Sequence, residues 1–240
     1  MLPVIQGIID RRLLVNFRCN PHALQQLLPH PFRPKLVEGH GVAGICLIRL
    51  QRIRPRGLPG FIGIGSENAA HRVAIEWTGS DGTPREGVFI PRRDTSSRVN
   101  HLLGGRFFPG VHHHATFDVR EDGEDFHVGF TSDDGRAHVR VTGRIAEALP
   151  AASIFRTVAE VSAFFQAGSV GFSPRHDDAL EGLELRTRDW KVTPLEVRAV
   201  ESSFFDDLQR FPRGSAVFDN ALLMRNIAHE WHAHPPSQMG

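Results

Sequence analysis

Tyrosine is missing from this chain of 240 residues, and lysine almost so. The aromatic residues are 17 Phe and 3 Trp, so any mechanism that needs a tyrosine proton donor is excluded. Among the basic residues, only Lys35 and Lys191 are lysines. The others are arginines, whose planar and permanently charged guanidinium suits the recognition of carboxylate or phosphate groups.

The chain also has few cysteines, no long apolar run and almost no net charge. The cysteines are Cys19 and Cys46, which lie far apart, and this favours free thiols in a reducing compartment. No apolar run reaches the roughly 18 residues of a transmembrane helix, and the first residues lack the pattern of a signal peptide. Lys and Arg number 28 against 27 Asp and Glu. We therefore expect a cytoplasmic protein that has neither nucleic acid nor membrane as a partner.

The hydrophobic pattern predicts a mainly β protein. Hydrophobic residues make up 40% of the chain and charged residues 23%, as in ordinary globular domains. We expect one domain over residues 1–240, with its core at about 10–225 and a frayed tail after His229. Alternating or apolar runs between Gly, Pro and Asp-Gly turns predict strands over residues 13–18, 42–53, 61–77, 86–93, 111–120, 126–131, 137–145, 183–188, 192–200 and 216–224. Residues 183–188 and 192–200 should form a hairpin, and the stretch 42–53 should be covered on both faces because it is apolar on both alternation phases.

A few helices are expected around these strands. The clearest covers residues 154–167, where large apolar side chains recur at helical spacing between Ser153 as a cap and Gly168 as a stop. Shorter helices are predicted over residues 21–28, 94–105 and 204–209, the second with Asp94 as its cap. Because helices interrupt the strands without regular alternation, the pattern argues against a doubly wound parallel sheet.

The segment from Gly60 to Trp77 carries the first candidate site. Its glycines do not form a dinucleotide fingerprint, because the third glycine and the following helix are missing. Strand alternation places Glu67 and His71 on one apolar face, which should point inward. A charged carboxylate there costs several kcal/mol unless it is paired or lines a wet cavity. Glu67 is therefore either an acid or base in a cavity or a member of a structural ion pair with an arginine.

Two arginines before Asp94 form the second candidate. In Pro91-Arg92-Arg93-Asp94, the guanidinium groups end a predicted strand just before the start of a predicted helix, an arrangement that can bind an anion. The alternative is that Asp94 caps the helix and pairs locally with Arg92 or Arg93.

Three adjacent histidines, His112, His113 and His114, form the third candidate. On a strand, His112 and His114 share the polar face with Thr116, whereas His113 should point inward with the apolar residues. A His-x-His pair is a weak zinc signal, and no third ligand follows by spacing. We expect surface and cavity histidines here rather than a metal site.

Three motifs together resemble the acetoacetate decarboxylase superfamily, and within it an uncharacterised, YqjF-like branch. They are Gly63-Ile-Gly-Ser-Glu67-Asn-Ala-Ala-His71-Arg72, Gly87-Val-Phe-Ile-Pro-Arg-Arg93-Asp94-Thr and Gly104-Gly-Arg-Phe-Phe-Pro109-Gly-Val-His112-His. The resemblance covers the chain from about residue 10 to about residue 225. It implies a closed, cone-like antiparallel β-barrel with a few peripheral helices, a central polar cavity and frequent assembly into homo-oligomers.

The resemblance also implies a mechanism that this chain cannot follow. In the decarboxylase, a lysine of depressed pKa forms a Schiff base with a β-keto acid, while a glutamate and an arginine in the cavity assist. The glutamate corresponds to Glu67 and the arginine to Arg72 or Arg93, but the segment from Asp94 to His114 that should hold the lysine contains none. Without an amine in the cavity there is no covalent electron sink, so decarboxylation by the family mechanism is disfavoured.

The sequence thus predicts a barrel that binds a small organic acid, with no cofactor or metal. Glu67 is the candidate catalytic acid or base, and the candidate substrate-binding residues are His71, Arg72, Arg93 and His113. Two alternatives stay open, because a fold alone does not license a function. One is a non-catalytic ligand-binding or accessory protein, and the other is a decarboxylase or aldolase-like enzyme that uses Lys191.

Overall fold

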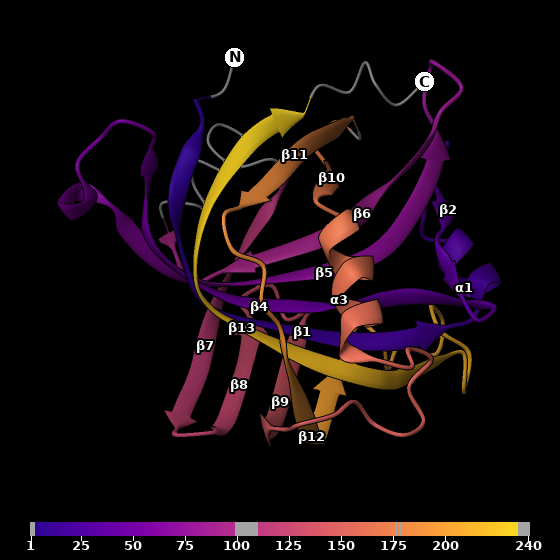
Figure 1. Cartoon of the computed structure of the whole chain (residues 1–240). Coiled ribbons are helices and arrows are strands. Elements are labelled where there is room, and N and C mark those ends of the chain that lie inside the picture. Colours follow the sequence, from indigo (N-terminus) through magenta and orange to yellow (C-terminus); the bar gives the residue numbers. More distant parts are fainter. Residues whose placement is uncertain (1–2, 99–109, 176, 178, 235–240) are drawn as a thin grey trace.

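The protein is described by a computed structural model over residues 3–98, 110–175, 177 and 179–234. Most of it consists of strands that curl into one sheet, with a helix packed on the outside (Figure 1). The strands are β1 (Ile5–Cys19), β2 (Arg33–Pro34), β3 (Leu36–Val37), β4 (His40–Pro55), β5 (Ile64–Thr78), β6 (Pro84–Thr95), β7 (His112–Asp122), β8 (Asp125–Ser132), β9 (His138–Ile145), β10 (Val170–Pro174), β11 (Leu180–Thr187), β12 (Thr193–Ser202) and β13 (Ala216–His234). The helices of the described residues are α1 (Pro21–Gln25), α3 (Val158–Ala167) and the 3₁₀ turn η1 (Gly60–Ile62).

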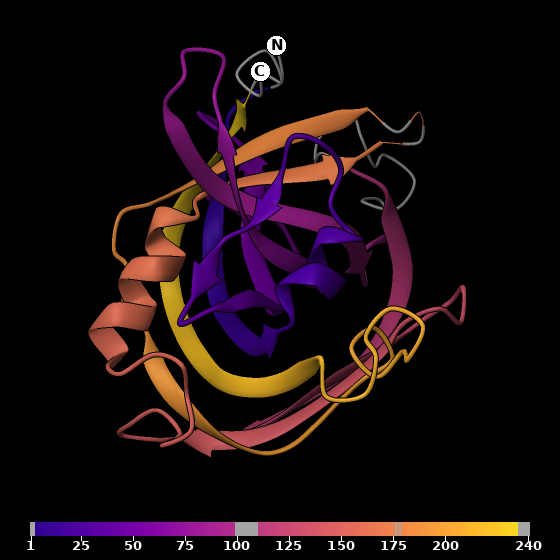
Figure 2. The same cartoon turned by 90° about the vertical axis from the view of Figure 1, so that its right-hand side faces the viewer.

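The strands pair in a closed circuit, which confirms the mainly β, cone-like fold predicted from the sequence. Strands β13, β1, β4, β5 and β6 lie side by side, and β7, β8, β9 and β12 lead back to β13. The circuit closes through two short seams, at residues 93–95 against 112–114 and at residues 193–195 against 221–223. The strands diverge on either side of these seams, and the sheet wraps around a central axis (Figure 2).

A second, smaller circuit shares the strands from β13 to β6. Strand β10 pairs with β6, and β11 pairs with both β10 and β13. Both faces of β4 consequently lie inside the protein over residues 41–47, which are all buried. The prediction for the stretch 42–53 holds there, whereas Gln51 and Arg52 near its end are exposed. The strand pairs are antiparallel, as predicted, except those of β6 with β7 and with β10, which are parallel.

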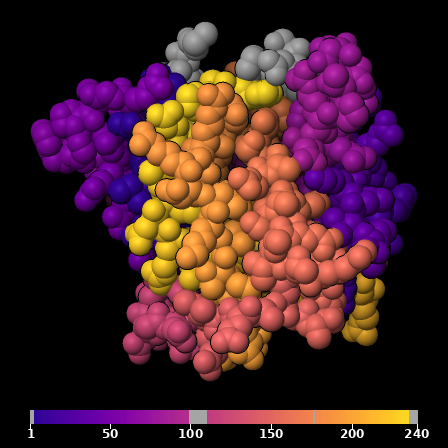
Figure 3. Space-filling model, in the orientation of Figure 1, coloured from indigo at the N-terminus to yellow at the C-terminus, as the bar shows by residue number. Residues whose placement is uncertain are grey.

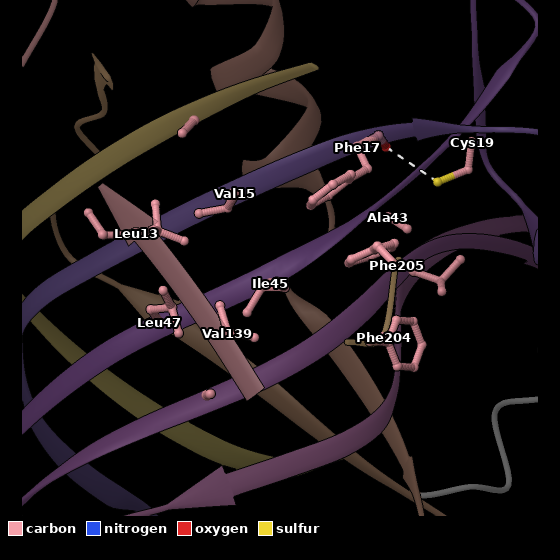
Figure 4. Packing of buried hydrophobic residues seen from close by; sticks show 14 of the residues in the cluster. Leu13, Val15, Phe17, Cys19, Ala43, Ile45, Leu47, Val139, Phe204 and Phe205 are labelled. Carbon is pink, nitrogen blue, oxygen red and sulfur yellow. Dashed lines mark hydrogen bonds between the residues drawn. The ribbon is translucent and has the colours of Figure 1, made fainter. Parts of the chain in front are cut away.

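Two clusters of buried apolar side chains lie on the two sides of the shared strands. The first lies inside the larger circuit, where Leu13, Ile45 and Val139 meet from β1, β4 and β9, and Phe204 and Phe205 pack against them (Figure 4). The second lies on the opposite face beneath α3 and includes Leu14, Cys46, Leu222 and Phe165. Alternation along the predicted strands 126–131 and 137–145 puts six side chains on an inward face, namely Phe126, Val128, Phe130, Val139, Val141 and Ile145. The first five are buried in the first cluster, and Ile145 packs against it partly buried.

The structure corrects several predicted elements. Strand β13 continues to His234 beside β11, so the residues directly after His229 belong to the sheet and are not frayed. Asp94 lies in β6 and is not a helix cap, and residues 99–105 of that predicted helix lie outside the described residues. Residues 204–209 form turns in place of a helix. Strands β11 and β12 do not pair as a hairpin, because each instead lies beside β13.

Helix α3 matches the clearest helical prediction but begins later. Thr157 caps it by accepting a hydrogen bond from the backbone N–H of Glu160, whereas Ser153, the predicted cap, donates to Asp219. Gly168 ends the helix, as expected. None of the described helices has the length and apolar character needed to cross a membrane.

Candidate functional site

Strand β5 separates the predicted site residues onto its two faces. Glu67 and His71 project toward the first apolar cluster, inside the larger circuit, as alternation predicted. Arg72 projects to the opposite face, toward α3, where its guanidinium lies over the ring of Phe165. Arg93 joins Arg72 on that second face, because Arg93 pairs with Ala70 across β5 and β6. The predicted residues therefore do not form one cluster.

Glu67 is held in an ion-pair cluster at one end of the larger circuit. Its carboxylate accepts hydrogen bonds from Arg11 at 2.6 Å and from Arg49. Arg11 also donates to Glu121 at 2.7 Å, and Glu121 pairs with Arg225 at 2.9 Å. The Glu67 side chain is 16% exposed and that of Arg11 is 0% exposed. This geometry matches the structural ion pair that the sequence left open as one of two alternatives for Glu67.

The cluster fixes the charge of its second carboxylate. Burial raises the pKa of Glu121, but the hydrogen bond and charge of Arg11 and the charges of Arg49 and Arg225 outweigh it, so the pKa is lowered overall. Three guanidinium groups thus surround two carboxylates that come from β5 and β7. The cluster joins strands on opposite sides of the circuit and stabilises its closure.

His71 is buried inside the larger circuit. It is 0% exposed and stacks on Phe204 with 4.5 Å between the ring centroids. Among the described residues, neither ring nitrogen has a hydrogen-bond partner. Burial, with smaller contributions from the charges of Arg92 and Arg210, lowers the pKa of His71 to about 3. The imidazole is therefore neutral at physiological pH, and its apolar surroundings are those of a core residue.

Arg72 is a buried cation on the second face. It is 4% exposed, donates to the side-chain oxygen of Asn16 and has its guanidinium 4.4 Å from the ring centroid of Phe165. Burial lowers its pKa to about 10. No carboxylate among the described residues pairs with it, which is an unusual state for a guanidinium at this depth.

Cys46 lies among the arginines of this face. Its sulfur accepts a hydrogen bond from Arg12 Nε at 3.1 Å. Cys46 is also buried in the second apolar cluster, as expected for a packing residue. The face thus combines an apolar wall with several cationic groups.

Arg93 lines a small cavity of about 60 Å³ on the second face. Its Nε donates to the hydroxyl of Ser173 at 3.0 Å, and burial lowers its pKa to about 10. No carboxylate among the described residues pairs with Arg93. His112, which is 9% exposed, and Asn68 supply further polar atoms to the cavity. The wall also includes Asp94, whose carboxylate is paired with Arg92. The remaining wall is largely apolar and includes Ile48, Leu50, Leu183 and Trp231.

The three histidines are arranged differently from the prediction. His112, which was assigned to the polar face, is buried, because β10 and β11 cover that face where β7 starts. His113 was predicted to point inward, but its side chain is 32% exposed and lies 3.2 Å from Asp134. His114 lies 2.7 Å from Asp133. Strand alternation did not identify His112 as a cavity residue, because the local sequence pattern does not show that β10 and β11 cover this face.

The two arginines before Asp94, Arg92 and Arg93, point to different faces of the sheet. Arg92 binds Asp94 at 2.8 Å and Asp134 at 2.9 Å, so its charge is balanced locally, as one sequence alternative stated. Burial lowers the pKa of Arg92, but the hydrogen bonds that Arg92 donates to the carboxylates of Asp94 and Asp134 outweigh it, so the pKa is raised overall. Arg93 points to the other face, where its one side-chain partner among the described residues is the hydroxyl of Ser173. Only Arg93 of the two is available to an anion in the cavity.

In the part of the chain that the structure describes, the wall of this cavity contains neither a metal-binding group of side chains nor a lysine. That part contains no group of three or more His, Cys, Asp or Glu residues that could hold a metal ion. Lys35 pairs with Glu86 and contacts the ring of Phe164 at 4.5 Å. Lys191 lies in the exposed loop between β11 and β12. Neither amine among these lysines lines the cavity.

Comparisons with known proteins support the fold. The chain matches the DUF2071 family, described as an uncharacterized conserved protein, over residues 9–218. The acetoacetate decarboxylase of Legionella pneumophila has a similar structure, with a TM-score of 0.61, 12% identity, and 98% of this chain and 88% of that chain covered. An acetoacetate decarboxylase-like enzyme from Sphingomonas wittichii RW1 gives a TM-score of 0.60 and 16% identity, with 97% and 91% covered.

A third structure is that of the enduracididine biosynthesis enzyme MppR complexed with pyruvate. It has a TM-score of 0.58 and 11% identity, with 97% of this chain and 88% of that chain covered. No curated protein matches the sequence. At these identities the structural likeness shows a shared acetoacetate decarboxylase-like fold, as the sequence motifs predicted.

Proposed function

The chain belongs to the DUF2071 family, and on that premise we propose that it binds a small organic acid in the cavity beside Arg93, without forming a Schiff base. The carboxylate of the ligand pairs with the Arg93 guanidinium. His112 and Asn68 contact the polar atoms of the remaining part, and the apolar wall surrounds its carbon atoms.

The state of Arg93 carries this proposal. Burying a guanidinium is unfavourable unless an anion and further hydrogen bonds compensate for the lost hydration. Arg93 has only the hydroxyl of Ser173 as a described side-chain partner, and Arg72 on the same face has only an amide. A bound carboxylate supplies the missing negative charge, and its two oxygens match the planar fork of an arginine.

The size of the cavity restricts the ligand. A volume of about 60 Å³ holds roughly four to six water-sized spheres, since one such sphere occupies about 10–15 Å³. That space suits a monocarboxylic acid with a short carbon chain, of the size of pyruvate. The structure of MppR with bound pyruvate, in the same fold, supports an acid of this class.

The chemistry at such a site is non-covalent. Lys191 is exposed on a loop and Lys35 is paired with Glu86, so the cavity has no described amine nucleophile. Glu67 is engaged by Arg11 and Arg49 on the other face of β5. Of the described titratable side chains beside Arg93 in the cavity wall, Asp94 is paired with Arg92, and His112 is therefore the one placed to exchange a proton with a ligand held by Arg93.

A thermal-shift titration with acetate, lactate, pyruvate and acetoacetate tests the proposal. At a concentration 100 times the dissociation constant, a ligand adds about 2.7 kcal/mol, which raises the Tm of a chain of this size by roughly 5–10 °C. We expect such a shift with at least one acid, its loss in Arg93→Met, and its retention in Arg140→Met, a control on the exposed side of β9. If none of the acids shifts the wild-type Tm, or if Arg93→Met responds like the control, the proposal is wrong.

A second candidate function is that of a binding protein that does not convert its ligand. A variant of His112 distinguishes this function from that of an enzyme. His112→Asn should keep the thermal shift, because Arg93 holds the carboxylate. If the protein is an enzyme, the same variant loses turnover of the acid that binds. If the wild type binds an acid and never converts it, the accessory function stands.

A further inference from the structure

A second pocket lies on the outside of the sheet, where the start of β1 and the end of β4 meet the end of β11 and the middle of β13. Its volume is about 380 Å³. The guanidinium-bearing residues that line it are Arg52, Arg54, Arg186 and Arg188, and Glu230 is the one carboxylate among its described lining residues. His229, which is 3% exposed, lies in its wall. This pocket shares no lining residue with the cavity beside Arg93.

Two of these arginines, Arg52 and Arg188, form neither an ion pair nor a side-chain hydrogen bond among the described residues. Arg186 pairs with Glu184 at 2.7 Å, and Arg54 donates to the backbone oxygens of Leu58 and Arg52. Arg52 and Arg188 are both exposed. The charge of Arg188 reaches Glu230 of the same pocket, where it adds a small contribution to the lowered pKa of that carboxyl beside the hydrogen bond with His232. The guanidinium groups of Arg52 and Arg188 are therefore available to an anionic ligand, and phosphate oxygens are a preferred partner of this group.

The backbone holds Arg52 in place. The pairing of β4 with β5 shifts register between Leu50 and Ile53, and Arg52 has a φ of 54°, in the left-handed region that few side chains adopt. Such bulges redirect a side chain out of the regular alternation. A Cβ atom on Gly63 would collide with the backbone of Arg52, so the close crossing of the two strands requires glycine there.

An apolar tip adjoins the arginine pocket. The hairpin between β4 and β5 projects from the body of the protein at the left of Figures 1 and 3. At its end, Phe61 is 88% exposed, Ile62 46%, Leu58 45% and Ile64 44%. Arg54 joins tip and pocket, because it lines the pocket while donating to the Leu58 carbonyl at 2.8 Å.

The charge of this region differs from that of the whole chain. The net charge of +1 conceals a stretch from Glu38 to Glu67 that has no acidic residue between its ends and contains Arg49, Arg52, Arg54 and Arg56. Exposed apolar side chains in front of a group of arginines are the combination that binds an anionic bilayer surface, where apolar groups enter the interface and cations meet the headgroups.

We propose that the arginine pocket and the hairpin tip together bind the headgroup phosphates of an anionic phospholipid surface. The pocket takes a phosphate between Arg52 and Arg188, and Phe61 and Ile62 enter the interface beside it. From the near-neutral net charge of the chain we expected no membrane partner. The present proposal rests instead on the local arrangement of charge. It concerns binding to the membrane surface alone.

Co-sedimentation with vesicles of phosphatidylcholine alone, or of phosphatidylcholine with 30% phosphatidylglycerol, tests the proposal at about 0.1 M salt. We expect at least tenfold tighter binding to the phosphatidylglycerol vesicles, and a progressive loss as salt increases. Arg52→Asn with Arg188→Ser should weaken this binding about tenfold or more, at roughly 1 kcal/mol per removed cation. Asparagine suits the first position because it tolerates a positive φ.

Matched controls separate this surface from a general effect. Arg120→Ser removes an arginine that is 78% exposed on the β7–β8 hairpin, and Leu208→Ser removes an apolar side chain that is 65% exposed elsewhere. Neither should change vesicle binding, whereas Phe61→Ser should weaken it about tenfold. Equal unfolding midpoints of all variants establish that they are folded.

Four results overturn the proposal. One is equal binding to both kinds of vesicle, and another is an effect of Arg120→Ser as large as that of the pocket variant. The third is binding of soluble tripolyphosphate in the pocket without vesicle binding, and the fourth is a lipid-free dimer that Phe61→Ser dissociates. Those outcomes assign the pocket to a soluble phosphate or the tip to contact with a second copy of the chain.

Discussion

Arg11 and Glu67 form an ion pair in which the guanidinium is 0% exposed and lies 2.6 Å from the carboxylate. Glu67→Gln leaves Arg11 with Glu121 as its remaining charged partner. Breaking a fully buried pair costs about 3–5 kcal/mol, and since Glu67 is 16% exposed we expect a loss of roughly 2 kcal/mol in urea unfolding at pH 7. Glu201→Gln, in the exposed pair with Arg140, should change stability by less than about 0.5 kcal/mol. Similar small effects of both substitutions would show that the cluster does not stabilise the fold.

The buried imidazole of His71 predicts a pH dependence of stability. Burial, aided by Arg92 and Arg210, lowers its pKa from 6.5 to about 3, so the unfolded chain binds a proton near pH 6 that the folded chain does not. This contribution to stability is complete above the unfolded pKa and is lost as the pH falls toward 3, by about 1.4 kcal/mol per pH unit. Between pH 7 and 5, the wild type should lose about 2 kcal/mol more than His71→Leu in urea unfolding. Parallel pH profiles of the two proteins would contradict the assignment.

Arg93 should lower the stability of the ligand-free protein. A partly buried guanidinium without a described carboxylate partner is unfavourable, and an apolar side chain of similar length removes that penalty. We expect Arg93→Met to be at least as stable as the wild type in the absence of ligand, measured by urea unfolding, while it loses the stabilisation by organic acids. A loss of more than about 2 kcal/mol would show that Arg93 is a structural residue.

Neither lysine should form a Schiff base. Lys191 is exposed on a loop, and Lys35 is paired with Glu86. We expect no adduct on either residue after incubation with pyruvate and borohydride, as measured by peptide mass spectrometry. An adduct on Lys191 that forms in the wild type and disappears in Arg93→Met would instead place that lysine at the ligand and restore the decarboxylase or aldolase alternative.

The local sequence pattern predicted burial correctly where burial depends on contacts between neighbouring strands. Alternation identified the buried face of β8 and β9, with Phe126, Val128 and Phe130, and the two apolar phases around Cys46 indicated a strand that is covered twice. The motif around Glu67 and Arg72 indicated the family and the fold. These features follow from contacts between neighbouring strands, which the sequence period records directly.

Features that depend on a second layer could not be predicted in this way. The burial of His112 requires β10 and β11, which return to β6 from a distant part of the chain. Glu67 and Arg93 lie on opposite faces of the shared strands, and each face lines a different circuit. Which circuit a face lines cannot be read from the pattern of a single strand. Asp94 has the residue type of a helix cap, but pairing with Arg92 and the β6–β7 seam keep it in a strand.

A crystal structure with bound pyruvate, or with whichever of the tested acids raises the Tm most, measures the site itself. We predict that a ligand carboxylate oxygen lies within about 3 Å of the Arg93 guanidinium, with the remaining atoms between His112 and the apolar wall. A ligand held at the Glu67 cluster, or a saturated crystal with nothing beside Arg93, would contradict the account.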